Sequence, residues 1–321
     1  MNSQTVKSNL MLLLTAIIWG FAFVAQRVGA AYVEPFTFNG IRFGLGSLSL
    51  IPLILFFDSR LPSREPQGGV PGHGSLRVVI PAGLIAGFIL FAGASLQQVG
   101  LAYADTTAGK AAFITGLYIV LVPILGIMLK RYISLSNWLG AVVALAGLYF
   151  LCIKPGLSIS RGDLLELLGA FFWAGHILLI DHLTNKKVNA LKLACTQYAV
   201  CSLLSLAVAL EFETINPAGL REAAIPILYG GILSVGIAYT LQIFGQKHAQ
   251  PAPAAIIMSL ETVFAALGGA ILLHESLGGR GILGCALMFT GMLLSQLQNL
   301  VGRRRGAVRS PQNRQESPDF G

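Results

Sequence analysis

Two stretches of this sequence, LGAVVALAGLYFL (residues 139–151) and LGCALMFTGMLLS (residues 283–295), share one pattern. Each is predominantly apolar, and each has glycine at its second and ninth positions. Further pairs at a similar offset are IIWGF (17–21) with AFFWAG (170–175), and QQVGLAYADTTAGKAAF (97–113) with LQIFGQKHAQPAPAAII (241–257). Repetition at a fixed offset is the sequence signature of a duplicated structure. The chain is therefore predicted to contain two related halves.

The composition predicts a membrane protein. Of the 321 residues, 55% are hydrophobic and 11% are charged, and the mean hydropathy is +0.72. Ordinary soluble domains carry about 25% charged residues, so this deficit excludes a soluble protein. A membrane-spanning helix needs roughly 20 mostly apolar residues. Ten such runs occur, at residues 9–31, 37–57, 77–102, 107–129, 135–153, 163–183, 191–210, 223–246, 252–273 and 280–300.

The fold class predicted from these runs is all-α integral membrane, with ten transmembrane helices in two inverted-topology five-helix repeats. The first repeat is expected over residues 9–153 and the second over residues 163–300. Because five is odd, the second repeat must enter the membrane in the opposite orientation. Inverted repeats recur in secondary transporters, whose substrate site lies near the bilayer midplane, where the halves meet. Residues 301–321 are expected to form a disordered, basic, cytoplasmic tail.

The lysines and arginines predict the orientation. If both termini are cytoplasmic, the inner connections hold most of the 22 lysines and arginines, as the positive-inside rule requires. Topology thus explains the net charge of +8, and no nucleic-acid partner is expected. The first run could be a cleaved signal peptide, since Lys7 precedes it and VGAA (28–31) follows. Its length and the presence of Trp19 and Gly20 favour a retained helix.

Several stretches resemble the EamA-type transporters of the drug/metabolite transporter superfamily. They are AIIWGFAFVAQRV (16–28), FNGIRFGLGSL (38–48), QQVGLAYADTTAGKAAFITGLYIVLVPILGIML (97–129), AAIIMSLETVFAALGGAILLHESL (254–277) and GILGCALMFTGMLL (281–294). The resemblance implies ten helices in the cell inner membrane, cytoplasmic termini, and export or exchange of small metabolites. The first half departs from the pattern, because Lys130-Arg131 stands where the second half has His274-Glu275.

Among the charged residues in the apolar runs, Glu261 lies nearest the middle of the membrane. Ionisable residues are costly inside membrane helices and usually face the bundle interior or a wet cavity. Small residues share the helix face of Glu261, so that face is expected to point inward. The carboxylate is predicted to bind a substrate ammonium or to carry a proton during transport. The structural alternative is a glutamate that is kept protonated by desolvation and hydrogen-bonded to a neighbouring helix.

Lys110 and Arg42 lie closer to the outer ends of their runs. Lys110 is about four residues in, roughly 6 Å deep, so its side chain can reach water. It fits either a lipid-facing position or the rim of a cavity, and the family resemblance favours the rim. Arg42 matches an arginine of the family's second helix and is expected to anchor at the interface or to tie a helix C-terminus rather than to touch substrate. Either cation could pair with Glu34 or Asp105.

The weaker candidates for substrate binding are aromatic or uncharged. Trp19 and Trp173 occupy matching positions in the two halves, well inside their runs, where each could line a cavity or pack against other helices. Gln98 and Gln242 could hydrogen-bond a substrate or a neighbouring helix. His176 could carry a proton or serve as a buried structural histidine.

The predicted function is a secondary transporter that moves small metabolites, such as amino acids, by efflux or exchange through alternating access. Prolines are expected to bend or break helices near the path, namely Pro123, Pro226, Pro251 and Pro253. No enzyme activity, metal or other cofactor is expected, because the four cysteines lack ligand spacing and no phosphate-binding loop occurs. The alternatives are an integral-membrane lipid-modifying enzyme and a passive channel. Proton coupling and homo-oligomer formation are left open.

Overall fold

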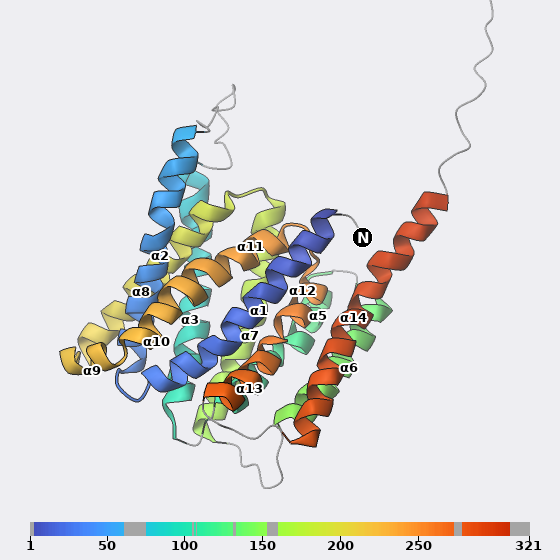
Figure 1. Ribbon diagram of the computed structural model, residues 1–321. Coiled ribbons are helices and arrows are strands. Elements are labelled where there is room, and N and C mark those ends of the chain that lie inside the picture. The colour runs from blue at the N-terminus through green and yellow to red at the C-terminus, as the bar shows by residue number, and fades with distance from the viewer. Residues whose placement is uncertain are drawn as a thin grey trace, which may run out of the picture.

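The chain folds into a bundle of helices (Figure 1). A computed structural model describes residues 3–60, 75–104, 106, 108–130, 133–152, 160–272 and 278–308, and these residues contain no strand. The helices in chain order are α1 (Ser3–Gly29), α2 (Pro35–Arg60), α3 (Leu76–Ala102), α4 (Ala108–Gly116), α5 (Tyr118–Met128), α6 (Leu135–Cys152), α7 (Arg161–Asn185), α8 (Ala190–Phe212), α9 (Pro217–Glu222), α10 (Ala224–Leu228), the π-helix η1 (Tyr229–Tyr239), α11 (Thr240–Gln246), α12 (Pro251–Met258), α13 (Glu261–Leu272) and α14 (Gly279–Val308).

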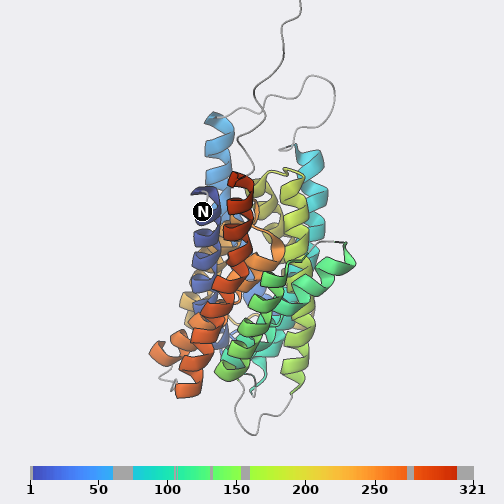
Figure 2. The same ribbon diagram turned by 90° about the vertical axis from the view of Figure 1, so that its right-hand side faces the viewer.

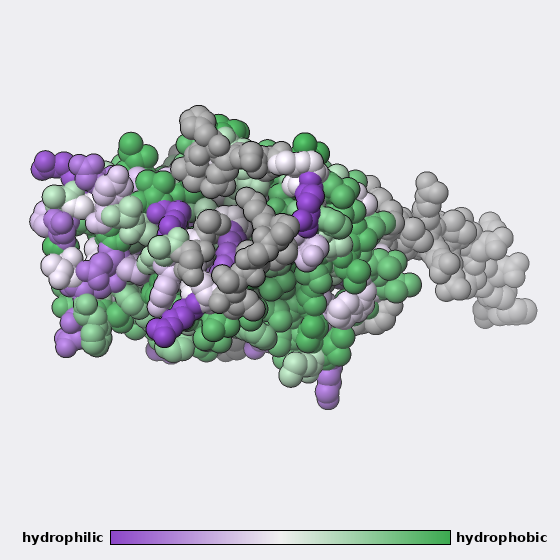
Figure 3. Space-filling view, turned by 90° about the horizontal axis from the view of Figure 1, so that it is seen from below, coloured by the Kyte–Doolittle hydropathy of each residue, from purple (hydrophilic) through white to green (hydrophobic). Residues whose placement is uncertain are grey.

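The lengths and apolar surfaces of these helices are those of a multi-pass membrane protein. Within the described ranges, eight helices or continuous helix series are long and apolar enough to cross a bilayer. Two shorter apolar stretches, Leu135–Leu151 and Gly279–Ser295, lie in α6 and α14. Seen end-on, the flanks of the bundle are hydrophobic, and hydrophilic side chains gather at the edge around α9 (Figure 3). The predicted all-α membrane class is confirmed.

The two ends of the described chain lie on the same side of the bundle. The start of α1 and the end of α14 are both at the top in two perpendicular views (Figures 1 and 2). Helix α14 continues to Val308, so the first part of the predicted disordered tail is helical. Residues 309–321 lie outside the described ranges, as do Arg131, His274 and Glu275 of the two turns compared above.

The two stretches that reveal the repeat pack against each other. Helices α6 and α14 run antiparallel, with Gly140 beside Gly291 and Gly147 beside Gly284. A Cβ atom built on Gly147 would lie 2.6 Å from the carbonyl oxygen of Gly284, and one built on Gly284 would lie 2.6 Å from that of Gly147. Small residues allow such close backbone approach between membrane helices. The shared glycine pattern therefore forms a reciprocal contact, which we call the glycine seam.

Other close contacts also join the first half of the chain to the second. Helix α2 packs along α8, where Ser202 Oγ donates a hydrogen bond to the carbonyl oxygen of Gly40 at 2.7 Å. Helix α3 packs against α7 and α8, and α1 packs against η1, α11 and α13. The core between the helices is therefore made by both halves together.

Two of the predicted runs are interrupted in their middle. The run at 107–129 consists of α4 and α5, which meet at Leu117. The run at 252–273 consists of α12 and α13, which meet at Ser259 and Leu260. Discontinuous membrane helices are tolerated where the freed backbone groups are buried in protein or line a cavity.

Neither interruption falls at a proline predicted to bend or break a helix. Pro123 lies inside α5. Pro251 and Pro253 lie in the first turn of α12, where a missing N–H costs no helical hydrogen bond. Pro226 lies in α10, and the wider-turned η1 begins soon after it, over Tyr229–Tyr239. π-Helices are rare and are often found at functional sites.

We expect Gly147→Ala to destabilise the protein by about 1–3 kcal/mol, because the new methyl group would meet backbone atoms of α14 that cannot move aside. Thermal unfolding in detergent measures the effect. Gly175→Ala in α7 is the matched control, since a Cβ there meets nothing within 4 Å and alanine is the better helix former. Equal stability of the two variants would contradict a close glycine seam.

Candidate functional site

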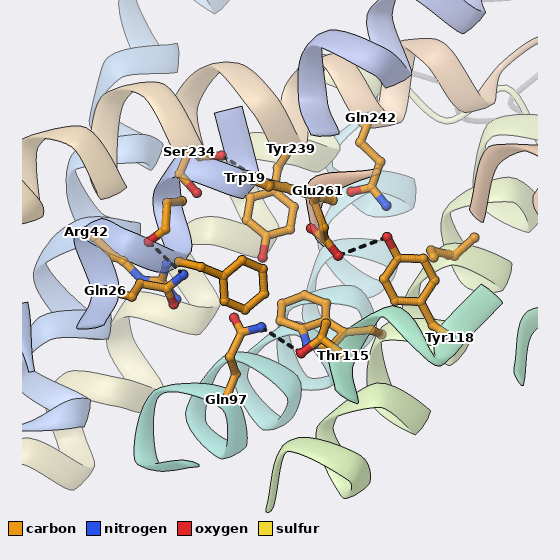
Figure 4. Close-up of a pocket in the computed structure, with 14 residues that line it drawn as sticks. Trp19, Gln26, Arg42, Gln97, Thr115, Tyr118, Ser234, Tyr239, Gln242 and Glu261 are labelled. Atoms are coloured by element: carbon orange, nitrogen blue, oxygen red, sulfur yellow. Dashed lines mark hydrogen bonds between the residues drawn. The ribbon is translucent and has the colours of Figure 1, made fainter. Parts of the chain in front are cut away.

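A pocket lies in the middle of the bundle, between helices of both halves (Figure 4). The first half contributes side chains from α1 to α5, and the second half contributes side chains from α7, η1, α11 and α13. Its lining residues are Trp19, Ala22, Phe23, Gln26, Arg42, Gln97, Thr115, Tyr118, Trp173, Ile177, Ser234, Tyr239, Gln242 and Glu261. Five of the eight predicted site residues are therefore brought together here, namely Trp19, Arg42, Trp173, Gln242 and Glu261.

Glu261 is held at the pocket by the two interrupted helices. It is the first residue of α13 and only 3% exposed. Tyr118, the first residue of α5, donates a hydrogen bond from its hydroxyl to Glu261 Oε1 at 3.0 Å. The N-terminal end of a helix carries partial positive charge, so the interruption provides a favourable position for a carboxylate. Glu261 also lines the pocket, so its carboxyl group lies beside the space that a ligand would occupy.

Arg42 brings a positive charge to the other side of the pocket (Figure 4). It is 1% exposed, and its Nε donates to Asn39 Oδ1 at 2.9 Å. Its guanidinium lies 4.9 Å from the centroid of the Phe43 ring, a cation–π arrangement. Nη2 has no hydrogen-bond partner among the described residues. The expectation of an interfacial anchor is therefore wrong, because the side chain turns into the bundle.

The ion pairs predicted for Arg42 are not made by the described residues. Glu34 instead accepts a hydrogen bond from the backbone N–H of Thr214 at 3.0 Å. Asp105 lies outside the described ranges. Arg42 is therefore held by an amide and by aromatic rings, which leaves part of its guanidinium able to bind an anion.

An aromatic cluster fills the space between the two charges. The ring of Tyr239 lies 4.6 Å from that of Trp19 in an edge-on arrangement and 6.1 Å from that of Trp173 in a stacked one. Trp19 Nε1 donates to the carbonyl oxygen of Ser234 at 3.3 Å, whereas Trp173 Nε1 has no partner among the described residues. The matching tryptophans of the two halves thus approach one tyrosine of η1.

Side-chain amides complete the pocket. Gln97 Nε2 donates to Thr115 Oγ1 at 3.2 Å. The side-chain oxygens of Gln26 and Gln242 are buried and have no hydrogen-bond partner among the described residues. Buried polar groups are usually satisfied, so unpaired groups around one cavity indicate a site for a polar ligand or for water.

A model of the EamA-like transporter family matches the sequence twice, over residues 6–153 and 160–297. The chain belongs to the EamA-like transporter family. The double match agrees with two repeated halves, and the pocket of this EamA-like protein takes its lining from both.

Individual relatives agree with this family. An uncharacterized transporter of Archaeoglobus fulgidus is 30% identical over 292 residues, which cover 91% of this chain and 86% of the relative. The uncharacterized transporter YoaV of Bacillus subtilis is 24% identical over 296 residues, covering 90% and 97%. A solved crystal structure superposes with a TM-score of 0.72 at 18% identity, covering 93% of this chain and 98% of the other, so the fold is shared. Together the matches support a membrane transporter.

The remaining three predicted site residues do not line the pocket. Gln98 is buried and donates to the backbone oxygen of Gln26 at 3.3 Å. His176 Nε2 lies 3.0 Å from Gln197 Oε1, and the imidazole packs edge-on against Trp173. Both residues support lining residues from behind.

Lys110 is the third, and it joins α4 to the start of α7. Its Nζ lies 2.6 Å from Asp163 Oδ2, and the two side chains are 12% and 5% exposed. Asp163 also caps α7, since the Ser160 N–H donates to Asp163 Oδ2 at 2.7 Å. A lipid-facing lysine is therefore excluded. Its partner is an acid on the first turn of the sixth predicted run, which was not considered from the sequence.

Glu166 is a buried carboxylate that the sequence analysis missed. It is 0% exposed, and Thr115 Oγ1 donates to its Oε2 at 3.1 Å. Because Thr115 also accepts from Gln97, Glu166 is linked to the pocket through a pocket residue. It lies only three positions inside the run at 163–183, so it resembled a residue of the membrane edge. The helix in fact begins at Arg161. An ionisable residue inside a membrane helix usually faces the bundle interior, which makes Glu166 a candidate for the same reason as Glu261.

We expect Asp163→Ala to destabilise this EamA-like protein by about 3 kcal/mol, because it leaves the Lys110 ammonium largely buried without this partner and removes a helix cap. Thermal unfolding in detergent measures the loss. The double variant Asp163→Ala/Lys110→Met should recover part of it, since the buried ammonium that paired with Asp163 is then absent as well. Strictly additive effects of the two substitutions would show that the pair is not coupled.

Proposed function

We propose that the protein is a secondary transporter for small zwitterionic metabolites, of which amino acids are the simplest. The observation that carries the proposal is the presence of one buried guanidinium group, that of Arg42, and one buried carboxyl group, that of Glu261, on opposite sides of a single pocket. Burying either charge is costly unless it is compensated. A ligand that carries both charges compensates both at once.

The pocket provides a partner for each part of such a ligand. The free Nη2 of Arg42 suits a carboxylate, which guanidinium groups bind with good geometry. Glu261 suits an ammonium, and the unpaired oxygens of Gln26 and Gln242 suit further N–H or O–H donors. The rings of Trp19, Trp173 and Tyr239 would contact an apolar side chain. Small, polar or amphipathic molecules therefore fit this lining better than fully apolar ones.

We further propose ten membrane spans in two inverted repeats, residues 9–153 and 163–300. The twofold family match supports repetition. The glycine seam supports inversion, because the second glycine of each repeated stretch meets the first glycine of the other across antiparallel helices. In each half the fourth run is interrupted, at Leu117 and at Ser259–Leu260. Helices α6 and α14, though shorter in apolar length, would then be the fifth span of each half.

Transport would proceed by alternating access, with the two halves moving against each other around the pocket. Glu261 is placed to exchange a substrate ammonium for a proton, which would couple transport to a proton gradient. The proposed mode of transport is efflux of the substrate or its exchange for another solute.

The proposed location is the cell inner membrane, with both termini in the cytoplasm. The support is that α1 starts and α14 ends on the same side of the bundle. Lysines also concentrate at that end, as in the turn with Lys186 and Lys187, and positive residues favour the cytoplasmic side.

The experiment that tests the function is counterflow of labelled amino acids into liposomes that contain the purified protein. We expect saturable counterflow for at least one zwitterionic amino acid. Glu261→Gln should raise the KM by about tenfold to a hundredfold, because a hydrogen bond to a charged group is worth about 1.5–3 kcal/mol. Glu211→Gln, at the exposed end of α8, is the matched control and should leave the KM unchanged.

Two outcomes would reject this proposal. Flux that never saturates would indicate a passive channel, and conversion of lipid headgroups by the purified protein would indicate an enzyme. Counterflow by Glu261→Gln with an unchanged KM and unchanged pH dependence would remove Glu261 from the mechanism.

Arg42→Lys keeps the positive charge but loses the planar guanidinium group, which binds a carboxylate through two parallel hydrogen bonds. This variant should also raise the KM for substrates with a carboxylate.

The topology has its own test. In a variant that lacks the four native cysteines, single cysteines at Ser3 and at the C-terminal end should both react with an impermeant thiol reagent only after the cytoplasmic face is opened. A cysteine at Thr214, between α8 and α9, should react from outside. Labelling of the two chain ends from different sides would overturn the inverted repeat.

A further inference from the structure

A second hollow opens at the end of the bundle where the chain termini lie. Helix α2 packs closely on η1, with Gly46 against Val235, but its last turns stand apart from α11. The hollow between them measures about 980 Å³ and is also lined by the turn between α7 and α8. We call it the α2–α11 groove. Its lining residues are Leu53, Ile54, Phe57, Asp58, Thr184, Asn185, Lys187, Val188, Asn189, Ala190, Leu191, Lys192, Thr240, Phe244, Lys247 and His248.

The groove is separate from the central pocket. Helix α11 and the end of η1 form the wall between the two, since Tyr239 and Gln242 face the pocket while Thr240 and Phe244 face the groove. The hydroxyl of Tyr198 lies 3.2 Å from that of Thr240 and closes the wall. A ligand of the groove therefore does not occupy the transport site.

The inner part of the groove is apolar. Leu53, Ile54 and Phe57 line it from α2, Leu191 lines it from α8, and Phe244 lines it from α11. Leu53 is 41% exposed and Phe57 is 47% exposed. Because α2, α8 and α11 belong to segments long and apolar enough to cross a bilayer, these side chains would meet hydrocarbon. From Leu53 to Phe57 they provide an apolar wall a little more than one helical turn long, roughly 6 Å, against which part of an acyl chain can lie.

The outer part of the groove is positively charged. Lys187, Lys192 and Lys247 stand at its mouth, with Asp58 as an acid among them. Lys192 Nζ lies 2.8 Å from Asp58 Oδ2 and ties α8 to α2. Lys247 Nζ lies 4.6 Å from the centroid of the Phe244 ring, so its ammonium is held over the apolar wall. Burial there lowers the pKa of Lys247.

The backbone of the α7–α8 turn and the N-terminal end of α8 add to the positive charge of the groove. Lys187 has a φ of 58° at the turn that ends α7, and the backbone N–H of Lys187 donates to the Thr184 oxygen at 2.9 Å, so the turn is fixed. Helix α8 begins at Ala190 in the same wall, after the cap residue Asn189. The N-terminal end of a helix favours negative charge nearby.

We propose that the α2–α11 groove binds a phospholipid with an anionic headgroup. The acyl chain lies along the apolar wall, and the phosphate lies among Lys187, Lys192 and Lys247. Basic pockets between membrane helices on the cytoplasmic side are suited to anionic headgroups, and that leaflet holds the anionic lipids. The inference does not depend on what the central pocket transports.

Native mass spectrometry of the full-length protein in detergent tests the proposal, with dioleoylphosphatidylglycerol as the anionic probe and dioleoylphosphatidylcholine as the neutral-headgroup control. We expect the anionic lipid to bind at least tenfold more tightly at low salt. Lys187→Gln/Lys247→Gln should weaken its binding by about tenfold or more, since each lysine near an anionic headgroup contributes on the order of 1 kcal/mol. Lys187→Gln alone should give a smaller loss.

The matched control is Lys186→Gln. Lys186 is the neighbour of Lys187 and is exposed, but it does not line the groove, so this variant should bind the anionic lipid like the parent. An equal loss in Lys186→Gln and Lys187→Gln would show unspecific surface attraction and overturn the proposal. Equal binding of both lipids would overturn it as well. Glycerol 3-phosphate binding as tightly as the anionic lipid would show that the groove recognises a soluble phosphate instead.

Discussion

Every backbone N–H and C=O group inside a bilayer must find its partner within the protein, because hydrocarbon offers none. The interruptions at Leu117 and at Ser259–Leu260 free such groups in the middle of the bundle. They are tolerable because both face other helices. Thr262, just after the second interruption, donates from its hydroxyl to the carbonyl oxygen of Ala112 at 3.0 Å. The polar groups at the centre of the bundle follow from this requirement. A helix end inside the membrane needs hydrogen-bonding partners for its backbone, and those partners are themselves polar.

The pocket lining shows what buried polar groups cost the folded protein in stability. Polar atoms buried without partners normally cost about 1–3 kcal/mol each, and among the described residues several surround this one cavity, including Arg42 Nη2, Trp173 Nε1 and Gln242 Oε1. The rest of the bundle has to supply the stability that they forfeit. Extensive helix packing, such as the glycine seam and the contact of α2 with α8, provides it.

The class of fold was predictable because bilayer thickness sets the length of an apolar run, and each predicted run does fall on a helix or a series of helices. Glu261 was identified for a similar reason, since a charge far from both ends of a run has no access to water. The depth estimate failed for Arg42, and Glu166 was missed. Both lie near the predicted end of a run, yet both turn inward. Which way a side chain points depends on the neighbouring helices, and a single sequence does not contain that information.

The positions of the interruptions were also beyond the sequence. Prolines are a local signal, but Pro251 and Pro253 are accommodated in a first helical turn. The breaks occur where side chains connect the two interrupted helices, since Thr262 donates to the Ala112 carbonyl oxygen and Tyr118 donates to Glu261. Lys110 illustrates the same limit. Its partner Asp163 is a cap residue 53 positions away in the chain, and only the packing of α4 against α7 brings the two together.

The glycine seam carries a consequence for the ancestry of the chain. Each helix in it presents the same two glycines, seven positions apart, and each glycine meets the other member of the pair on the facing helix. A surface of this kind is self-complementary. A half-length polypeptide with one such helix already holds everything required to associate with an identical copy that entered the membrane upside down, so fusion of two genes would have preserved an existing contact rather than created one.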